Sequence, residues 1–125
     1  MLSKDSTLLI VDDMKMIRTA MKRFLNQLGY NNFIEASDGE EALIKYAESK
    51  PQFIFMDIVM PGTTGYDALR IIRESDKKTP IVMLSSVAEE NVIKDCEKEG
   101  ILSYLIKPLT AEDGAARLSQ ILAKV

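Results

Sequence analysis

The sequence predicts a doubly wound α/β domain, in which five helices cover both faces of one five-stranded parallel sheet. Five short apolar runs, near residues 7–11, 33–36, 53–56, 81–84 and 104–106, are bounded by turn-forming or charged residues, as buried strands are. An amphipathic stretch follows each run. Polar side chains end most of the runs, at the sheet edge where open α/β sheets bind ligands.

The amphipathic stretches carry apolar residues at helical spacing. In chain order these are Ile17, Ala20, Met21, Phe24, Leu25 and Leu28; Ala42, Leu43, Tyr46 and Ala47; Tyr66, Leu69 and Ile72; Val92, Ile93 and Cys96; Ala115, Leu118, Ile121, Leu122 and Val125. Gly29 and Gly100 are helix stops, and Asp38 with Glu41 predicts a capping box. Because the run at 33–36 is short and partly polar, we place it at a sheet edge.

Composition bounds the kind of protein. A chain of 125 residues is expected to form one domain over residues 1–125. Its net charge of −3 argues against nucleic acid or anionic lipid as a partner. No apolar run approaches the roughly 20 residues that cross a bilayer, and no secretory apolar core precedes the first strand. A single cysteine, Cys96, fits a reducing compartment, so we expect a cytoplasmic protein.

Acidic residues end two of the predicted strands. Asp12 and Asp13 follow the first apolar run, and Asp57 follows the third. If these strands are neighbours, three carboxylates meet, and each raises the pKa of the others unless a cation lies between them. A hard ion with oxygen ligands, such as Mg²⁺, suits the site. Zinc is disfavoured, because the chain has no histidine and its only thiol lies in a helix.

Two further strands end in other polar groups. Ser85-Ser86 ends the fourth run and Lys107-Pro108 the fifth. A metal, a nucleophilic carboxylate, an ammonium and a hydroxyl are the parts needed to move a phosphoryl group. Each feature alone has a simpler interpretation: Asp12-Asp13 as a helix N-cap, the serines as a turn, the lysine as a loop entry, and Tyr104 as a surface strand aromatic. Only the combination favours phosphoryl chemistry.

Four motifs carry a resemblance to the receiver domain of two-component response regulators, most closely the free-standing chemotaxis type. They are Val11-Asp12-Asp13, Met56-Asp57-Ile58-Val59-Met60-Pro61-Gly62 with Gly65 beyond, Leu84-Ser85-Ser86, and Tyr104-Leu105-Ile106-Lys107-Pro108. The resemblance covers essentially the whole chain. It implies a flavodoxin-like fold with strand order 2-1-3-4-5, an order that is known for chemotaxis receivers and is taken over from them.

The resemblance also implies a phosphoacceptor and a metal site. Asp57 would accept a phosphoryl group from the phosphohistidine of a sensor histidine kinase. Mg²⁺ would be held by the side chains of Asp13 and Asp57 and by the backbone carbonyl of Val59. Asp12 would act mostly through bound water.

The remaining motif residues would respond to the phosphoryl group. Lys107 would pair with its oxygens, and the Lys107-Pro108 bond is expected to be cis. Ser85 would move toward it, and Tyr104 would then turn inward. Partners would read the change on a surface at roughly residues 88–124.

We expect a single-domain regulator with no output domain that signals through protein contact, in chemotaxis by binding a flagellar switch protein. A phosphorelay intermediate that passes the group to a phosphotransfer protein is the alternative. The chain would phosphorylate and dephosphorylate only itself, with a phosphatase as a further partner; it would be a monomer, with dimerisation on activation left open. A dehalogenase-type hydrolase would need a second acid where Val59 stands, and the intact site argues against a mere docking module.

Departures from the family pattern suggest a long-lived signal. Ile101-Leu102 is bulkier than usual after Gly100, and Leu109 stands where an aromatic residue is frequent. Val59 and Val87 lie two residues past the acceptor and past Ser85, positions that flank the attacking water in the family. Because a valine side chain cannot orient water, we predict slow self-dephosphorylation.

Overall fold

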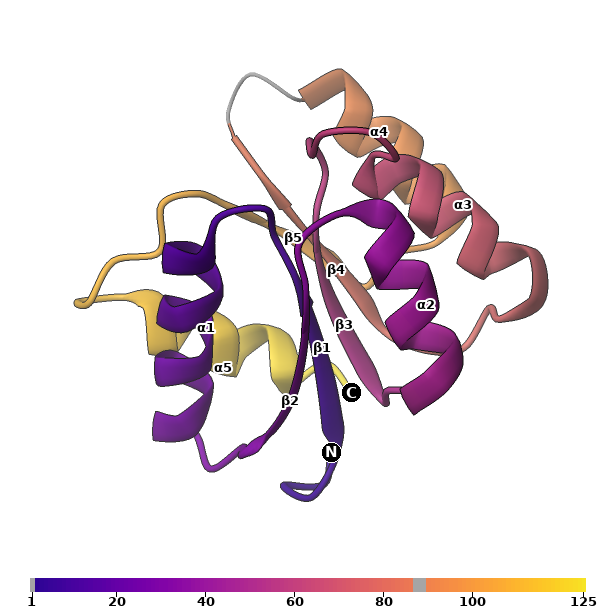
Figure 1. The fold of residues 1–125 in the computed structure, drawn as a ribbon. Coiled ribbons are helices and arrows are strands. Elements are labelled where there is room, and N and C mark those ends of the chain that lie inside the picture. Colours follow the sequence, from indigo (N-terminus) through magenta and orange to yellow (C-terminus); the bar gives the residue numbers. More distant parts are fainter. Residues whose placement is uncertain (1, 87–89) are drawn as a thin grey trace.

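The computed structural model describes residues 2–86 and 90–125, and within them strands and helices alternate along the chain (Figure 1). The strands are β1 (Thr7–Val11), β2 (Asn32–Ala36), β3 (Phe53–Asp57), β4 (Ile81–Ser85) and β5 (Ser103–Ile106). The helices are α1 (Lys15–Gln27), α2 (Gly39–Ser49), α3 (Gly65–Ser75), α4 (Glu90–Glu99) and α5 (Gly114–Leu122). The predicted fold class is confirmed.

The strands form one parallel sheet in the order β2-β1-β3-β4-β5. The edge position predicted for β2 is therefore confirmed, and β3 lies at the centre. Helices α1 and α5 cover one face of the sheet, while α2, α3 and α4 cover the other (Figure 1). The register places Val11 beside Met56 and Asp57 beside Leu84, so the carboxyl ends of β1, β3 and β4 come together at one edge.

The core lies on both sides of the sheet. Neighbouring strand residues point to opposite faces, so Leu9 and Ile54 pack in the core under α2–α4, while Leu8 and Phe53 pack in the core under α1 and α5. All four side chains are fully buried. Burial on both faces explains why these strands are continuously apolar, and each such side chain contributes roughly 1.5–3 kcal/mol to folding.

Most of the expected helix ends are confirmed. The carboxylate of Asp38 accepts a hydrogen bond from the Glu41 backbone N–H at 2.7 Å, and the Glu41 carboxylate accepts one from the Ser37 N–H at 2.8 Å. Gly29 and Gly100 follow α1 and α4 with φ of 100° and 93°, a conformation that glycine adopts without strain. The Lys107-Pro108 peptide bond is cis, as expected.

The interpretation of Asp12-Asp13 as the N-cap of the first helix is wrong. The N-cap of α1 is Met14, which makes no side-chain capping bond. The Asp12 carboxylate instead accepts a hydrogen bond from the Met14 N–H at 2.9 Å, within the loop before the helix. That bond leaves the second carboxylate oxygen of Asp12 available to the sheet edge. In the described part of the chain, no helix is long and apolar enough to cross a membrane.

Candidate functional site

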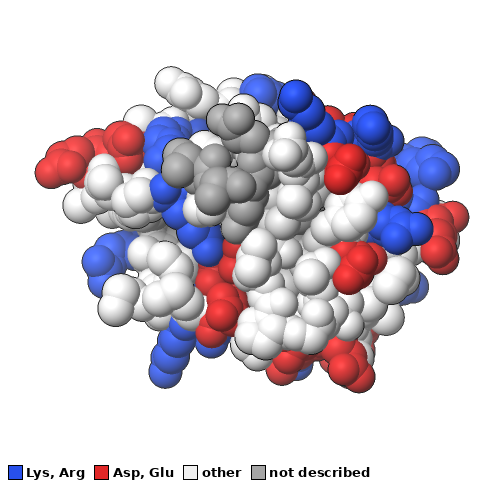
Figure 2. Space-filling view, turned by 90° about the horizontal axis from the view of Figure 1, so that it is seen from above, with Lys and Arg blue, Asp and Glu red and all other residues white. Residues whose placement is uncertain are grey.

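Three acidic residues meet at the carboxyl edge of the sheet. Asp12 and Asp13 follow β1, Asp57 ends β3, and one carboxylate oxygen of each lies within 4.8 Å of the others. Asp12 and Asp57 are 0% and 5% exposed, while Asp13 is open to solvent. Seen from above, acidic side chains lie in the middle of this face with basic ones beside them (Figure 2). The strand order thus brings together the acids that the sequence places at two strand ends.

Asp12 is held by its backbone and by one carboxylate oxygen. Its N–H donates to the Ala36 carbonyl of β2 at 3.1 Å, and its own carbonyl accepts a hydrogen bond from Arg18 Nη1 at 2.7 Å. Its Oδ2 atom is buried and, apart from an ammonium 2.8 Å away, has no hydrogen-bond partner in the described part of the chain. A buried carboxylate oxygen in this state favours a further cation.

That ammonium belongs to Lys107, which follows β5. Lys107 Nζ lies 2.8 Å from Asp12 Oδ2 and 3.1 Å from Asp57 Oδ1. Burial disfavours the charged amine, but its hydrogen bond to Asp12 and the charge of Asp57 outweigh this cost and raise the pKa of Lys107. The backbone N–H of Lys107 also donates to the Ser85 carbonyl at 2.7 Å, which holds the lysine backbone at the end of β4.

The ionised form of Asp57 is disfavoured in the folded protein. Burial, followed by the negative charge of Asp12, raises its pKa to about 6, although the nearby Lys107 ammonium acts in the opposite direction. One ammonium among three carboxylates leaves an excess of negative charge. An all-oxygen donor set with a buried, under-partnered oxygen fits a hard divalent cation such as Mg²⁺.

The loop after Asp57 folds tightly back on the strand end. The Gly65 N–H donates to the Ile58 carbonyl at 2.8 Å, and a Cβ on Gly65 would overlap the Asp57 carbonyl oxygen. Only glycine fits this approach without a shift of the backbone. Val59 lies in this loop and is 56% exposed. Because its side chain is a hydrocarbon, it offers the site no polar side-chain atom.

Ser85 and Tyr104, which are expected to respond to the phosphoryl group, differ in how deeply they are buried. Ser85 ends β4 next to Leu84, the register partner of Asp57, and is fully buried. Its hydroxyl donates to the Ser86 carbonyl at 2.8 Å. Tyr104 on β5 is 42% exposed, so its ring lies outward. Val87 and the first two positions of the expected partner surface, 88 and 89, lie outside the described residues.

A cluster of ion pairs next to Asp12 was not predicted from the sequence. Arg18 Nε on α1 donates to Glu35 Oε1 on β2 at 3.0 Å, and Lys22 Nζ donates to the other Glu35 oxygen at 2.9 Å. The hydrogen bond to Lys22 is the largest of the effects that lower the pKa of Glu35. A signal was present: Glu35 is the charged residue of β2, and Arg18 and Lys22 are four residues apart on one helix face.

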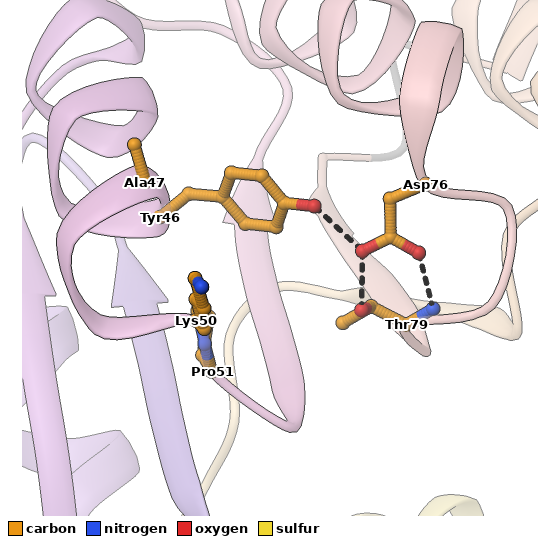
Figure 3. A pocket seen from close by; sticks show the side chains of 6 residues that line it. All are labelled: Tyr46, Ala47, Lys50, Pro51, Asp76 and Thr79. Atoms are coloured by element: carbon orange, nitrogen blue, oxygen red, sulfur yellow. Dashed lines mark hydrogen bonds between the residues drawn. The ribbon is translucent and has the colours of Figure 1, made fainter.

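A hollow of about 310 Å³ lies at the opposite, amino-terminal end of the strands (Figure 3). Asp76 is one of the residues that line it. Its carboxylate accepts hydrogen bonds from the Tyr46 hydroxyl at 2.6 Å and from the hydroxyl and N–H of Thr79 at 2.5 and 3.0 Å. Burial and the bond to Asp76 raise the pKa of Tyr46 to about 12. These polar groups are hydrogen-bonded to one another, so we assign the network a structural role.

Comparisons with known proteins all indicate the same family. Residues 8–119 match the response regulator receiver domain. The chain is 34% identical to chemotaxis protein CheY-3 of Vibrio cholerae serotype O1 over 126 residues, covering 99% of this chain and 97% of that protein. It is also 34% identical to chemotaxis protein CheY of Pseudomonas aeruginosa over 120 residues, covering 94% and 97%.

A solved structure shows the same fold. The crystal structure of the CheX-CheY-BeF3-Mg²⁺ complex from Borrelia burgdorferi contains a chain that superposes with a TM-score of 0.84. The two chains are 32% identical, and the match covers 94% of this chain and 86% of that one. The five-stranded fold is therefore that of a known kind of domain.

Proposed function

Since the chain belongs to the receiver-domain family of response regulators, we propose that its Asp57 accepts a phosphoryl group from a sensor histidine kinase. The observation that carries this proposal is the meeting of Asp57 with Asp12, Asp13 and Lys107 at the sheet edge. A buried carboxylate beside an ammonium and a cation-seeking acid pair is equipped for phosphoryl transfer and has no evident structural use.

The transfer replaces one bond to phosphorus with another. An Asp57 carboxylate oxygen forms a P–O bond while the P–N bond to the donor histidine breaks, and the leaving imidazole nitrogen keeps the electron pair and takes up a proton. The product is an acyl phosphate on Asp57. Lys107 Nζ, already 3.1 Å from Asp57 Oδ1, is placed to pair with the incoming phosphoryl oxygens. The chain acts on itself and turns over no separate substrate.

The acid cluster would hold Mg²⁺ for this step. The side chains of Asp13 and Asp57 and the backbone carbonyl of Val59 would be ligands, with Asp12 acting through bound water. When bound, the ion supplies positive charge that offsets both the carboxylates and the phosphoryl oxygens. Burial raises the pKa of Asp57 to about 6, and the added positive charge would favour the ionised carboxylate that attacks.

Ser85 and Tyr104 would convert the new charge into a change of surface. The Ser85 hydroxyl donates to the Ser86 carbonyl at 2.8 Å, and phosphoryl oxygens are stronger acceptors. A shift of Ser85 would open space that the exposed ring of Tyr104 can enter. The partner surface would comprise α4, β5 and α5, within roughly residues 88–124.

The partners follow from the chemistry and from the relatives. A cytoplasmic sensor kinase would supply the phosphoryl group, and a flagellar switch protein or a phosphotransfer protein would read it. Chemotaxis is supported by the similarity to chemotaxis proteins over nearly the whole chain. The Borrelia burgdorferi structure, with CheX and Mg²⁺, supports both a partner protein and the cation.

The test is phosphorylation by acetyl phosphate, whose P–O bond to acetate breaks as the bond to Asp57 forms. Intact mass should show one added phosphoryl group in the presence of Mg²⁺ and none without it. The Asp57→Asn variant should stay unmodified, while Asp95→Asn, which changes an exposed acid of α4, should match the parent protein. An adduct that persists in Asp57→Asn, or no adduct at all in the parent, would overturn the proposal.

A further inference from the structure

Arg18 contacts Asp12 at its backbone carbonyl, whereas Lys107 contacts its carboxylate. Its Nη1 donates to the Asp12 carbonyl oxygen at 2.7 Å, while its Nε donates to Glu35 Oε1 at 3.0 Å. We propose that Arg18 is a positioning residue for the cation site, and that it acts by fixing the peptide bond between Asp12 and Asp13. The inference rests on the proposed function, because it concerns the same site.

The peptide geometry explains how Arg18 reaches Asp13. The Asp12 carbonyl belongs to the planar unit that ends at the Asp13 Cα atom. When its oxygen is held, the plane is held, and with it the N–Cα bond of Asp13 from which the side chain is carried. Asp13 is exposed, and its side chain has no hydrogen bond or ion pair within residues 2–86 and 90–125. Its orientation therefore depends on its backbone.

The other side of Asp12 is held independently. Its N–H is bound to the Ala36 carbonyl, and its Oδ1 accepts from the Met14 N–H. Neither bond restrains the carbonyl oxygen, whose hydrogen bond from Arg18 is the one that the structure gives it among the described residues. Loss of Arg18 would leave the strand end in place but free the peptide plane that leads to Asp13.

Arginine suits this role better than lysine. Its planar fork donates to two acceptors at once, one on β2 and one on the loop after β1. The Arg18 side chain is only 15% exposed, so water competes weakly for either bond. Lys22 binds the other oxygen of Glu35 from the next helical turn and has no contact with Asp12.

Three possible roles of Arg18 predict different effects on Mg²⁺ binding: it could position Asp13, act through its charge, or only stabilise the fold. Arg18 is a cation close to a cation site, so its charge alone would weaken Mg²⁺ binding, and its removal would then tighten binding. A purely structural role would lower the melting temperature equally with and without Mg²⁺. Positioning predicts weaker binding and a smaller rise in melting temperature on addition of Mg²⁺.

The experiment compares Arg18→Met with Lys22→Met, which removes the other cation bound to Glu35. Mg²⁺ affinity is measured by titration calorimetry on the full chain, with no phosphodonor present, and melting temperature is measured with and without Mg²⁺. Arg18→Met should weaken Mg²⁺ binding by roughly 10-fold or more, the usual effect of losing a group that orients a metal ligand. Lys22→Met should stay within about 2-fold of the parent, because it leaves the bond to Asp12 intact.

Two further variants make the result decisive. Arg18→Lys can reach one acceptor but not both, so it should bind Mg²⁺ with intermediate affinity, and it serves if Arg18→Met does not fold. Asp13→Asn should lose most of the affinity. If the parent binds Mg²⁺ and Asp13→Asn does not, but the Arg18 variants bind normally or more tightly, the inference is wrong while the proposed site stands. If the parent binds no Mg²⁺, both are wrong.

Discussion

The ammonium of Lys107 lies 3.1 Å from the carboxylate of Asp57, although the two residues end strands that are separated by β4. The same ammonium lies 2.8 Å from Asp12 and so joins the two buried acids of the site. Without a bound cation, the Lys107 ammonium favours the ionised form of Asp57 and acts against the burial that raises its pKa. It also marks where phosphoryl oxygens would find a partner.

Replacement of Lys107 by methionine should therefore impair phosphorylation more than folding. We expect the rate of Asp57 phosphorylation by acetyl phosphate to fall by roughly 100-fold, because a charged donor to the developing charge is lost. The measurement is the rate at which the phosphorylated mass appears at fixed Mg²⁺. Lys124→Met, which removes an exposed lysine near the carboxyl terminus, is the control. A comparable rate in Lys107→Met would exclude a role for the ammonium in transfer.

Stability without Mg²⁺ should fall as the pH rises. The pKa of Asp57 is raised to about 6 in the folded protein, mainly by burial, whereas in the unfolded chain it is about 4. The folded state therefore holds this proton more tightly, and the cost of ionising Asp57 is absent below about pH 4 and fully present above about pH 6. Asp57→Asn should remove this cost and stabilise the metal-free protein near pH 7.5 by about 1–3 kcal/mol.

Urea unfolding in the presence of a chelator, at several pH values, measures this difference. The gap between Asp57→Asn and the parent should widen between pH 4 and 6 and should shrink when Mg²⁺ is added near neutral pH. A gap that does not depend on pH would mean that Asp57 keeps its ordinary pKa when the protein folds.

Val59 should slow the loss of the phosphoryl group. Val59 is 56% exposed and lies two residues after Asp57, and its side chain has no polar atom with which to hold an attacking water. We expect Val59→Asn to speed decay of the phosphorylated protein by about 10-fold, since an amide can orient that water. Val59→Leu, which keeps the position apolar, should decay like the parent. Rapid decay in the parent that Val59→Asn leaves unchanged would contradict the prediction.

Two glycines near the site offer a matched pair of substitutions. A Cβ on Gly65 would overlap the Asp57 carbonyl oxygen, so Gly65→Ala must displace the backbone that carries Asp57. We expect it to cost roughly 3 kcal/mol or more of unfolding free energy and to abolish most phosphorylation. Gly62 has open space around it and a φ of 74°, so Gly62→Ala should cost only about 1 kcal/mol.

Unfolding and phosphorylation of the two alanine variants test this contrast. Equal losses in both variants would show that backbone conformation, and not the close approach of Gly65 to Asp57, governs the loop.

Much of the site could be predicted because its acids end apolar strands. The runs before Asp12 and Asp57 are continuously apolar, which is typical of strands buried on both faces, and parallel strands bring their carboxyl ends to one edge. The cap predicted at Asp38 was also confirmed, because a capping box uses only neighbours in the chain. The cap interpretation of Asp12 failed, because Asp12 lies too early to cap a helix that begins at Lys15.

The sequence by itself determined the alternation of strands and helices, the absence of histidine chemistry and the placement of acids, a serine and a lysine at strand ends. Only the tertiary structure decided that Asp12 is buried while Asp13 is exposed, that burial raises the pKa of Asp57, and that Arg18 binds the Asp12 carbonyl. The physical reason is distance. Apolar periodicity and capping are local, whereas burial and charge act through space between segments that only the register of the sheet and the packing of α1 bring together.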